Sequence, residues 1–243
     1  MSIINNSYRF IFVHVPKAAG TSVTAALSPL TNYCDLEIGG TAFGEAIQPA
    51  YQKRFELAKH SPAAAIRGLV GSVTWSRYFT FAFVRNPFDR SLSTYNFLRQ
   101  WKGPGSDFYK RMCAFDSFDD YVLSDIWHST DGPDLIFRPQ VYWLRAQNSN
   151  QILTSFIGKV ELLEKDLEQV LLNIDAPRHM VSALKRLNSS GPKPKVVSEN
   201  PAVIEKILDK YRIDFESFGY DSAPKGLVPA AHAASGETNS SIT

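Results

Sequence analysis

The sequence contains few cysteines and no long run of apolar residues. Only two cysteines, Cys34 and Cys113, occur among the 243 residues, and no C-x-x-C or Cys/His spacing accompanies them. This composition excludes a disulfide framework and a cysteine-based zinc site, and it predicts a buried or otherwise inert thiol at each position. No apolar stretch approaches the ~20 residues of a membrane-spanning helix, so we expect no membrane span.

The N-terminus and the overall charge also lack distinguishing signals. Residues 1–9 have neither the charged start nor the cleavage site of a secretory signal peptide. A complete chain with these properties is expected to work in a reducing cytoplasm. The formal net charge of +2 gives no strongly basic field, so we expect no nucleic-acid partner. Nothing in the composition indicates an oligomeric state.

What the sequence does contain is a repeated pattern of apolar strand, loop and helix. The first unit runs from Tyr8 through a loop at Pro16–Thr21 into a helix that ends near Leu27. The second has a strand at Phe79–Val84 and a helix over residues 88–99. Strands of nearly continuous apolar residues are typical of a parallel sheet that helices cover on both faces. The pattern therefore predicts an α/β domain.

The rest of the chain adds further elements and a polar tail. Further helices are expected at Gly44–Lys59, Asp116–Ser124, Leu162–Ile174 and Ser198–Tyr211, a third strand at Ile152–Val160, and loops at Lys102–Ser106, Ser129–Pro133 and Asn188–Lys195. From Asp221 onward the chain consists largely of small and polar residues, which predicts a disordered tail over residues 221–243. One domain is therefore expected over residues 1–220.

The loop after the first strand has the composition of an anion-binding loop. The run Val15-Pro16-Lys17-Ala18-Ala19-Gly20-Thr21-Ser22 brings an ammonium, two hydroxyls and backbone N–H groups to a helix N-terminus. The helix dipole favours anions at that position. The order of residues differs from a Walker A loop, which requires G-x-x-x-x-G-K-[ST]. The loop predicts a phosphate-like ligand of another kind.

The second loop places a cation at the same edge of the sheet. Ligands in open α/β sheets bind beyond the carboxyl ends of the strands, where both loops are expected. Arg85 is the first residue after its strand, and Asp89, Ser93 and Asn96 follow on one polar stripe of the next helix. Ser93 can therefore point to the same edge of the sheet as Arg85.

The two loops together resemble the donor-binding motifs of the sulfotransferases, most closely the carbohydrate sulfotransferases of the family 2 type. Val15–Ser22 looks like their 5′-phosphosulfate loop, and Phe83–Ser93, with V-R-N-P-F-D-R, looks like their 3′-phosphate motif. The segments Phe137–Gln140, Phe156–Glu161 and Tyr211–Tyr220 resemble later parts of the same family. The resemblance covers about residues 8–220.

The resemblance implies a fold and a donor. The fold is a P-loop NTPase-like, three-layer α/β domain with a central parallel sheet, the sulfotransferase fold. The donor is 3′-phosphoadenosine-5′-phosphosulfate (PAPS), which leaves 3′-phosphoadenosine-5′-phosphate (PAP) as the product. No metal is required, because the cations of the protein can neutralise the donor phosphates.

The resemblance also assigns roles to individual residues. It places Lys17 near the bridging oxygen of the phosphosulfate, where a fixed cation stabilises the charge that develops on transfer. The residues that it assigns to donor binding are Lys17, Ala19, Gly20, Thr21 and Ser22 at the 5′ end, Arg85 and Ser93 at the 3′-phosphate, and Lys193 from a late loop. The planar fork of an arginine suits a phosphate.

A base for the accepting hydroxyl is less sharply indicated. Histidine suits this task near neutral pH, and His60 precedes Pro62 and lies upstream of the Arg85 strand. Glu45 is the alternative, because some sugar sulfotransferases use a glutamate soon after the first loop. His14, directly before the loop, fits a packed histidine that shapes it better than a base. The sequence does not choose an adenine-stacking residue among its tryptophans.

The expected function is therefore transfer of a sulfuryl group to an acceptor hydroxyl, on a carbohydrate, a glycan or a small glycoside. One alternative is a nucleotide-binding module without turnover, and another is a P-loop small-molecule kinase. A kinase requires a Walker A loop and a strand that ends in an acidic residue to hold Mg²⁺. In this chain the second strand is followed by Arg85 instead.

Overall fold

A computed structural model describes residues 2–100, 106–129, 135–181 and 197–222 of the chain. A mixed five-stranded sheet forms the centre of the molecule. The strand order is β3-β1-β2-β4-β5. The strands are β1 (Ser2–Asn5), β2 (Phe10–Val13), β3 (Leu36–Ile38), β4 (Phe79–Val84) and β5 (Phe156–Lys159). Strands β2, β4 and β5 run parallel, whereas β1 is antiparallel to both of its neighbours.

The parallel sheet expected from the sequence thus holds for three strands, and β1 and β3 extend it on one side. The sequence did not predict these two strands. They are short, and β1 is held by the pairing of Ile3 with Phe12 rather than by a long apolar pattern of its own. Strand β2 is also shorter than the expected Tyr8–Val15, because the chain leaves the sheet at His14 to form the loop.

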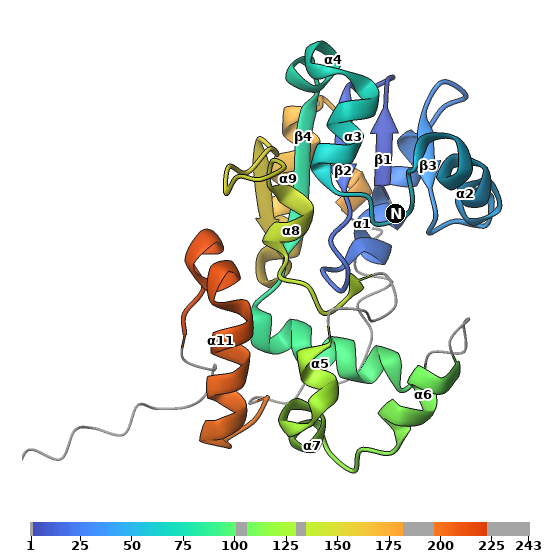
Figure 1. Cartoon of the computed structure of the whole chain (residues 1–243). Helices are drawn as coiled ribbons and strands as arrows, with labels where there is room; N and C mark the ends of the chain where they lie inside the picture. The colour runs from blue at the N-terminus through green and yellow to red at the C-terminus, as the bar shows by residue number, and fades with distance from the viewer. Residues whose placement is uncertain (1, 101–105, 130–134, 182–196, 223–243) are drawn as a thin grey trace, which may run out of the picture.

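The helices follow the expected α/β alternation and add several short segments (Figure 1). They are α1 (Gly20–Leu27), α2 (Ala42–Phe55), α3 (Ala63–Val70), α4 (Ser72–Arg77), α5 (Pro87–Leu98), α6 (Ser106–Cys113), α7 (Phe118–Leu123), α8 (Val141–Leu144), α9 (Leu163–Asn173) and α11 (Pro201–Phe218). Single turns of 3₁₀-helix lie at Ser28–Leu30, Asp125–His128, Val160–Leu162 and Arg178–Val181.

Helices cover both faces of the sheet. Alternate side chains of β2 point to opposite faces. Phe10 and Phe12 pack with α1 and α9, whereas Ile11 and Val13 pack with α3, α4 and α8. The three layers and the strands that are buried on both faces agree with the fold expected from the sequence.

A third apolar cluster lies beyond the carboxyl ends of the parallel strands. Helix α5 continues directly from β4, and α6, α7 and α11 gather around it (Figure 1). Asn86 caps α5 by accepting a hydrogen bond from the backbone N–H of Phe88 at 2.9 Å, with Pro87 in the first turn. This cap fixes where β4 ends and α5 begins, so it also fixes the position of Arg85.

Two further expectations need correction. The last helix does not end at Tyr211 but continues to Phe218, with a kink where Tyr211 has φ −113° and ψ 21°. Both cysteines are free and exposed rather than buried.

Within the part of the chain that the structure describes, none of the helices combines the length and apolar character needed to cross a bilayer.

Some expectations fall outside the described residues. These are the loop that carries Lys193, residues 223–243 of the expected tail, and nearly all of the two loops at Lys102–Ser106 and Ser129–Pro133.

Candidate functional site

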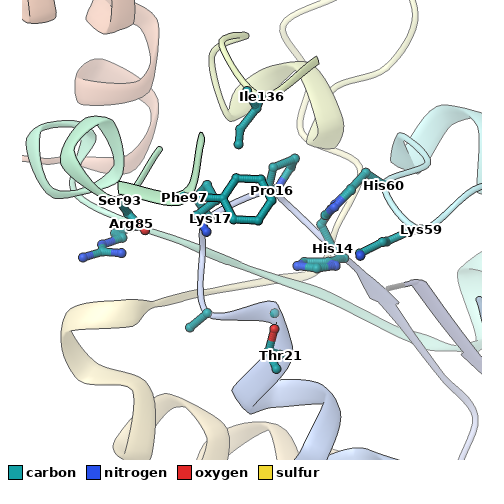
Figure 2. Close-up of a pocket in the computed structure, with 12 residues that line it drawn as sticks. His14, Pro16, Lys17, Thr21, Lys59, His60, Arg85, Ser93, Phe97 and Ile136 are labelled. Atoms are coloured by element: carbon teal, nitrogen blue, oxygen red, sulfur yellow. The ribbon is translucent and has the colours of Figure 1, made fainter. Parts of the chain in front are cut away.

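One cavity of about 240 Å³ lies where β2 and β4 end (Figure 2). It is lined by His14, Pro16, Lys17, Ala19, Gly20, Thr21, Lys59, His60, Arg85, Ser93, Phe97 and Ile136. The structure therefore brings both sequence motifs and the histidine candidate to a single site. Ser22 and Glu45 are not among these lining residues.

The first loop turns sharply into α1. Lys17 and Ala19 both have left-handed backbone conformations, with φ of 64° and 58°. Such conformations are uncommon for residues with a side chain and collect at functional sites. The carbonyl of Ala19 accepts hydrogen bonds from the N–H groups of Ser22 and Val23 at 3.0 and 3.1 Å, so α1 begins at Gly20. Its N-terminus faces the cavity, as an anion site requires.

Gly20 is the point of closest approach in this loop. A Cβ atom added there would lie 1.6 Å from Nε2 of His14, so any larger residue would displace the His14 ring. The His14 ring is buried and lies 4.3 Å from the His60 ring, between centroids. His14 thus occupies the position of a packed residue that shapes the loop.

Lys17 projects its ammonium group into the cavity. Its Nζ lies 4.0 Å from the centroid of the Phe97 ring, a cation–π contact. Burial, together with the nearby charges of Arg85, Arg90 and Lys59, lowers the pKa of Lys17 to about 8. Among the described residues that line the cavity, none is Asp or Glu. An anionic ligand fits this concentration of positive charge.

Arg85 lines the cavity and is held in place by its backbone. The Arg85 N–H donates to Oε1 of Gln140 at 2.9 Å, and Nε2 of Gln140 donates to the Arg85 carbonyl at 2.8 Å. Gln140 is in turn held by the buried Asp214, which accepts its N–H at 2.7 Å. Ser93 lies on the same side of the cavity as Arg85 (Figure 2).

Arg90 is a buried cation that the sequence reasoning did not single out. Only 1% of it is exposed, and its guanidinium donates to the carbonyls of Pro16, Arg138 and Ile136 at 3.1, 3.1 and 2.9 Å. It therefore joins the Lys17 loop to the segment that carries Ile136. The second arginine of V-R-N-P-F-D-R was the available signal.

His60 lies beside His14 with a defined ring orientation. Its Nδ1 is 3.1 Å from the His14 carbonyl oxygen. A carbonyl can only accept, so Nδ1 carries the proton and Nε2 of the neutral ring has the lone pair. Burial lowers the pKa of His60 well below its ordinary value, and the charges of Lys59 and Lys17 add to this effect. The ring is thus neutral at neutral pH.

Glu45 lies on α2, and its carboxylate is bound by two neighbouring groups. Its Oε1 accepts hydrogen bonds from the Gly40 N–H at 2.9 Å and from Nζ of Lys59 at 3.1 Å. The bond from Gly40 is the main reason that the pKa of Glu45 is lowered, followed in the same direction by Lys59. The alternative in which Glu45 acts as the base stays a prediction made from the sequence.

Three further lining residues had only weak sequence signals. Lys59 precedes His60, Phe97 follows Ser93 by one helical turn, and Ile136 precedes a segment that the family resemblance had already marked. The sequence left open which tryptophan stacks on the adenine. In the structure Trp75, Trp127 and Trp143 are buried, and none of these three lines the cavity. Within the described residues, no group of three or more His, Cys, Asp or Glu is arranged to hold a metal ion.

The fold and the cavity agree with the comparison with known families. The profile described as "Sulfotransferase family" matches residues 1–221, and the chain belongs to this family of enzymes. Its relatives include carbohydrate sulfotransferase 14 of Danio rerio, 26% identical over 242 residues, which cover 90% of this chain and 61% of that protein.

Mammalian relatives carry the same name. Carbohydrate sulfotransferase 14 of Homo sapiens is 23% identical over 240 residues, which cover 90% of this chain and 59% of that protein. The Mus musculus protein is 23% identical, with the same coverage. The chain thus spans about 60% of the length of the curated relatives that it matches. No solved structure matches the chain with significance.

Proposed function

We propose that this chain transfers a sulfuryl group from PAPS to a hydroxyl of a carbohydrate or glycoside acceptor. The observation that carries the proposal is the single cavity in which the Lys17 loop and the Arg85–Ser93 pair meet. The names of the relatives support a carbohydrate acceptor. No metal is invoked, because protein cations line the cavity.

Each motif has a distinct task in this proposal. Arg85 and Ser93 bind the 3′-phosphate, through the guanidinium fork and a hydroxyl. The Gly20 and Thr21 N–H groups at the start of α1 bind the 5′-phosphate. Figure 2 places Lys17 between the Arg85–Ser93 pair and the two histidines, where its ammonium can neutralise the bridging oxygen as the S–O bond breaks.

His60 is the proposed base. Its Nε2 receives the proton of the accepting hydroxyl while the oxygen of that hydroxyl forms its bond to sulfur. The His14 carbonyl fixes the ring in the required tautomer by accepting from Nδ1. The lowered pKa keeps the ring neutral and ready to accept a proton at pH 7. Positioning and electrostatics supply the catalysis, as in phosphoryl transfer.

The experiment that tests this function combines binding and turnover. The protein is incubated with ³⁵S-labelled PAPS and a panel of sugar, glycoside, lipid and phenol acceptors, and ATP is tested as a competitor. We expect labelled sugar products, and Lys17→Ala is expected to lose turnover. Binding of PAP without transfer to any acceptor would favour the nucleotide-binding module. Binding of ATP as tight as that of PAP would favour the kinase.

A further inference from the structure

Lys59 lines the cavity although it belongs to neither donor motif. Its side chain is 33% exposed, and Figure 2 shows it on the opposite side of His14 from Arg85. Its charge is close enough to help lower the pKa of both Lys17 and His60. An anion bound between the ammonium groups of Lys17 and Lys59 would be attracted by both.

The side chain of Lys59 is held at its charged end and along its stem. Its Nζ donates to Oε1 of Glu45 at 3.1 Å, and the same oxygen accepts from the Gly40 N–H at 2.9 Å. At Gly39, where φ is +75°, an added Cβ would come within 2.9 Å of Cβ of Lys59. The Gly39–Gly40 turn therefore packs directly against the lysine stem.

The backbone of Lys59 is held as well. Its N–H donates to Oε1 of Gln48 on α2 at 2.8 Å, and its carbonyl accepts from Oγ of Ser2 at 3.3 Å. A lysine side chain loses conformational freedom when it is fixed. A partly exposed ion pair returns little of that free energy. The Lys59–Glu45 pair is thus a poor source of stability but a good way to fix a charge in place.

We propose that Lys59 is a catalytic residue that contacts the non-bridging sulfuryl oxygens, and that Glu45 is a positioning residue that orients it. The proposal rests on the proposed function. In the transfer step a bond forms between the acceptor oxygen and sulfur, and the bond from sulfur to the bridging oxygen breaks. The electron pair leaves with PAP, the acceptor proton passes to Nε2 of His60, and Lys59 keeps its own proton throughout.

PAPS and PAP distinguish this role, because only PAPS carries the sulfuryl group. Dissociation constants of both nucleotides are measured by calorimetry, without an acceptor, for the wild type and for Lys59→Met. We expect Lys59→Met to weaken PAPS binding about tenfold or more, as for the loss of a charge-assisted hydrogen bond. PAP binding is expected to change less than about twofold, which also shows that the variant is folded.

The control for charge is Lys53→Met, which removes an exposed lysine at the end of α2 and is expected to alter neither constant. Glu45→Gln keeps an oxygen acceptor but removes the charge that orients Lys59. We expect it to weaken PAPS binding severalfold and to leave PAP binding unchanged, which a merely structural role would not produce.

Two outcomes overturn the proposal. Equal weakening of PAP and PAPS in Lys59→Met would place the lysine on a phosphate, and no change in either would remove it from the donor. Both differ from failure of the proposed function, in which the wild type itself would not bind PAPS more tightly than ATP.

Discussion

At the scale of single residues, the cavity depends on the protonation states of two neighbouring groups. His60 must be neutral to accept a proton, and its pKa is well below 6.5 because of burial and nearby cations. The value of kcat/KM should therefore fall only when the pH drops well below 6.5, as His60 becomes protonated. The measurement is a pH profile of kcat/KM from pH 4.5 to 9. An acidic limb centred at or above pH 6.5 would contradict this account.

Lys17 should give the opposite dependence on pH. Its ammonium must be protonated to bind an anion, and its pKa is lowered to about 8. The affinity for PAP is therefore expected to be complete well below pH 8 and to weaken as the pH rises through that value. Lys17→Arg should remove this dependence, because a guanidinium stays charged. The dissociation constant of PAP, measured from pH 6.5 to 9.5, tests this, and a flat wild-type profile would refute it.

Gly20 is a residue whose replacement the packing of the loop disfavours. Alanine there would place Cβ 1.6 Å from the His14 ring, so we expect a loss of about 1–3 kcal/mol in unfolding free energy and weaker PAP binding. Gly68→Ala in α3 is the matched control, since no atom lies within 4 Å of its added Cβ. That change should stabilise the protein by ~0.5–1 kcal/mol. Urea denaturation measures both, and equal effects would contradict the packing argument.

At the scale of elements, Arg90 connects segments that the sequence separates widely. It donates to three carbonyls, one in the Lys17 loop and two in the segment before Gln140. Arg90→Met leaves these carbonyls without a partner, so we expect a loss of about 3 kcal/mol or more in unfolding free energy. PAP binding should weaken too, because the loop loses its anchor.

The control for Arg90→Met is Arg67→Met on the exposed side of α3, expected to change stability by less than ~0.5 kcal/mol. Urea denaturation and PAP calorimetry on the two variants give the comparison. A fully stable Arg90→Met protein with normal PAP affinity would show that the loop does not depend on this contact.

The strands and helices also show which parts of the fold local sequence patterns can predict. The apolar runs of β2 and β4 and the Asn86–Pro87 start of α5 were readable, because burial on both faces and capping leave a local signature. Strands β1 and β3 carry little pattern of their own and exist through pairing with neighbours. The extension of α11 past Tyr211 likewise depends on packing, since Phe215 and Phe218 are buried against other elements.

At the scale of the whole molecule, the sequence predicted the two loops that line the cavity better than the residues that connect these loops to the rest of the site. Lys17 and Arg85 were identified from loops next to strands, whose ends must meet at one sheet edge. Lys59, Phe97 and Arg90 were not, because their roles arise from contacts between segments distant in the chain. The cytoplasmic location expected from the sequence stays a prediction.

The central claim is that one nucleotide bridges the Arg85 and Lys17 sides of the cavity. Calorimetric titration with PAP and with adenosine 5′-phosphate, which lacks the 3′-phosphate, tests it most directly in wild type and Arg85→Met. We predict that the wild type prefers PAP by about tenfold or more, and that Arg85→Met loses this preference while retaining its affinity for adenosine 5′-phosphate. An unchanged preference for PAP in Arg85→Met would contradict the account.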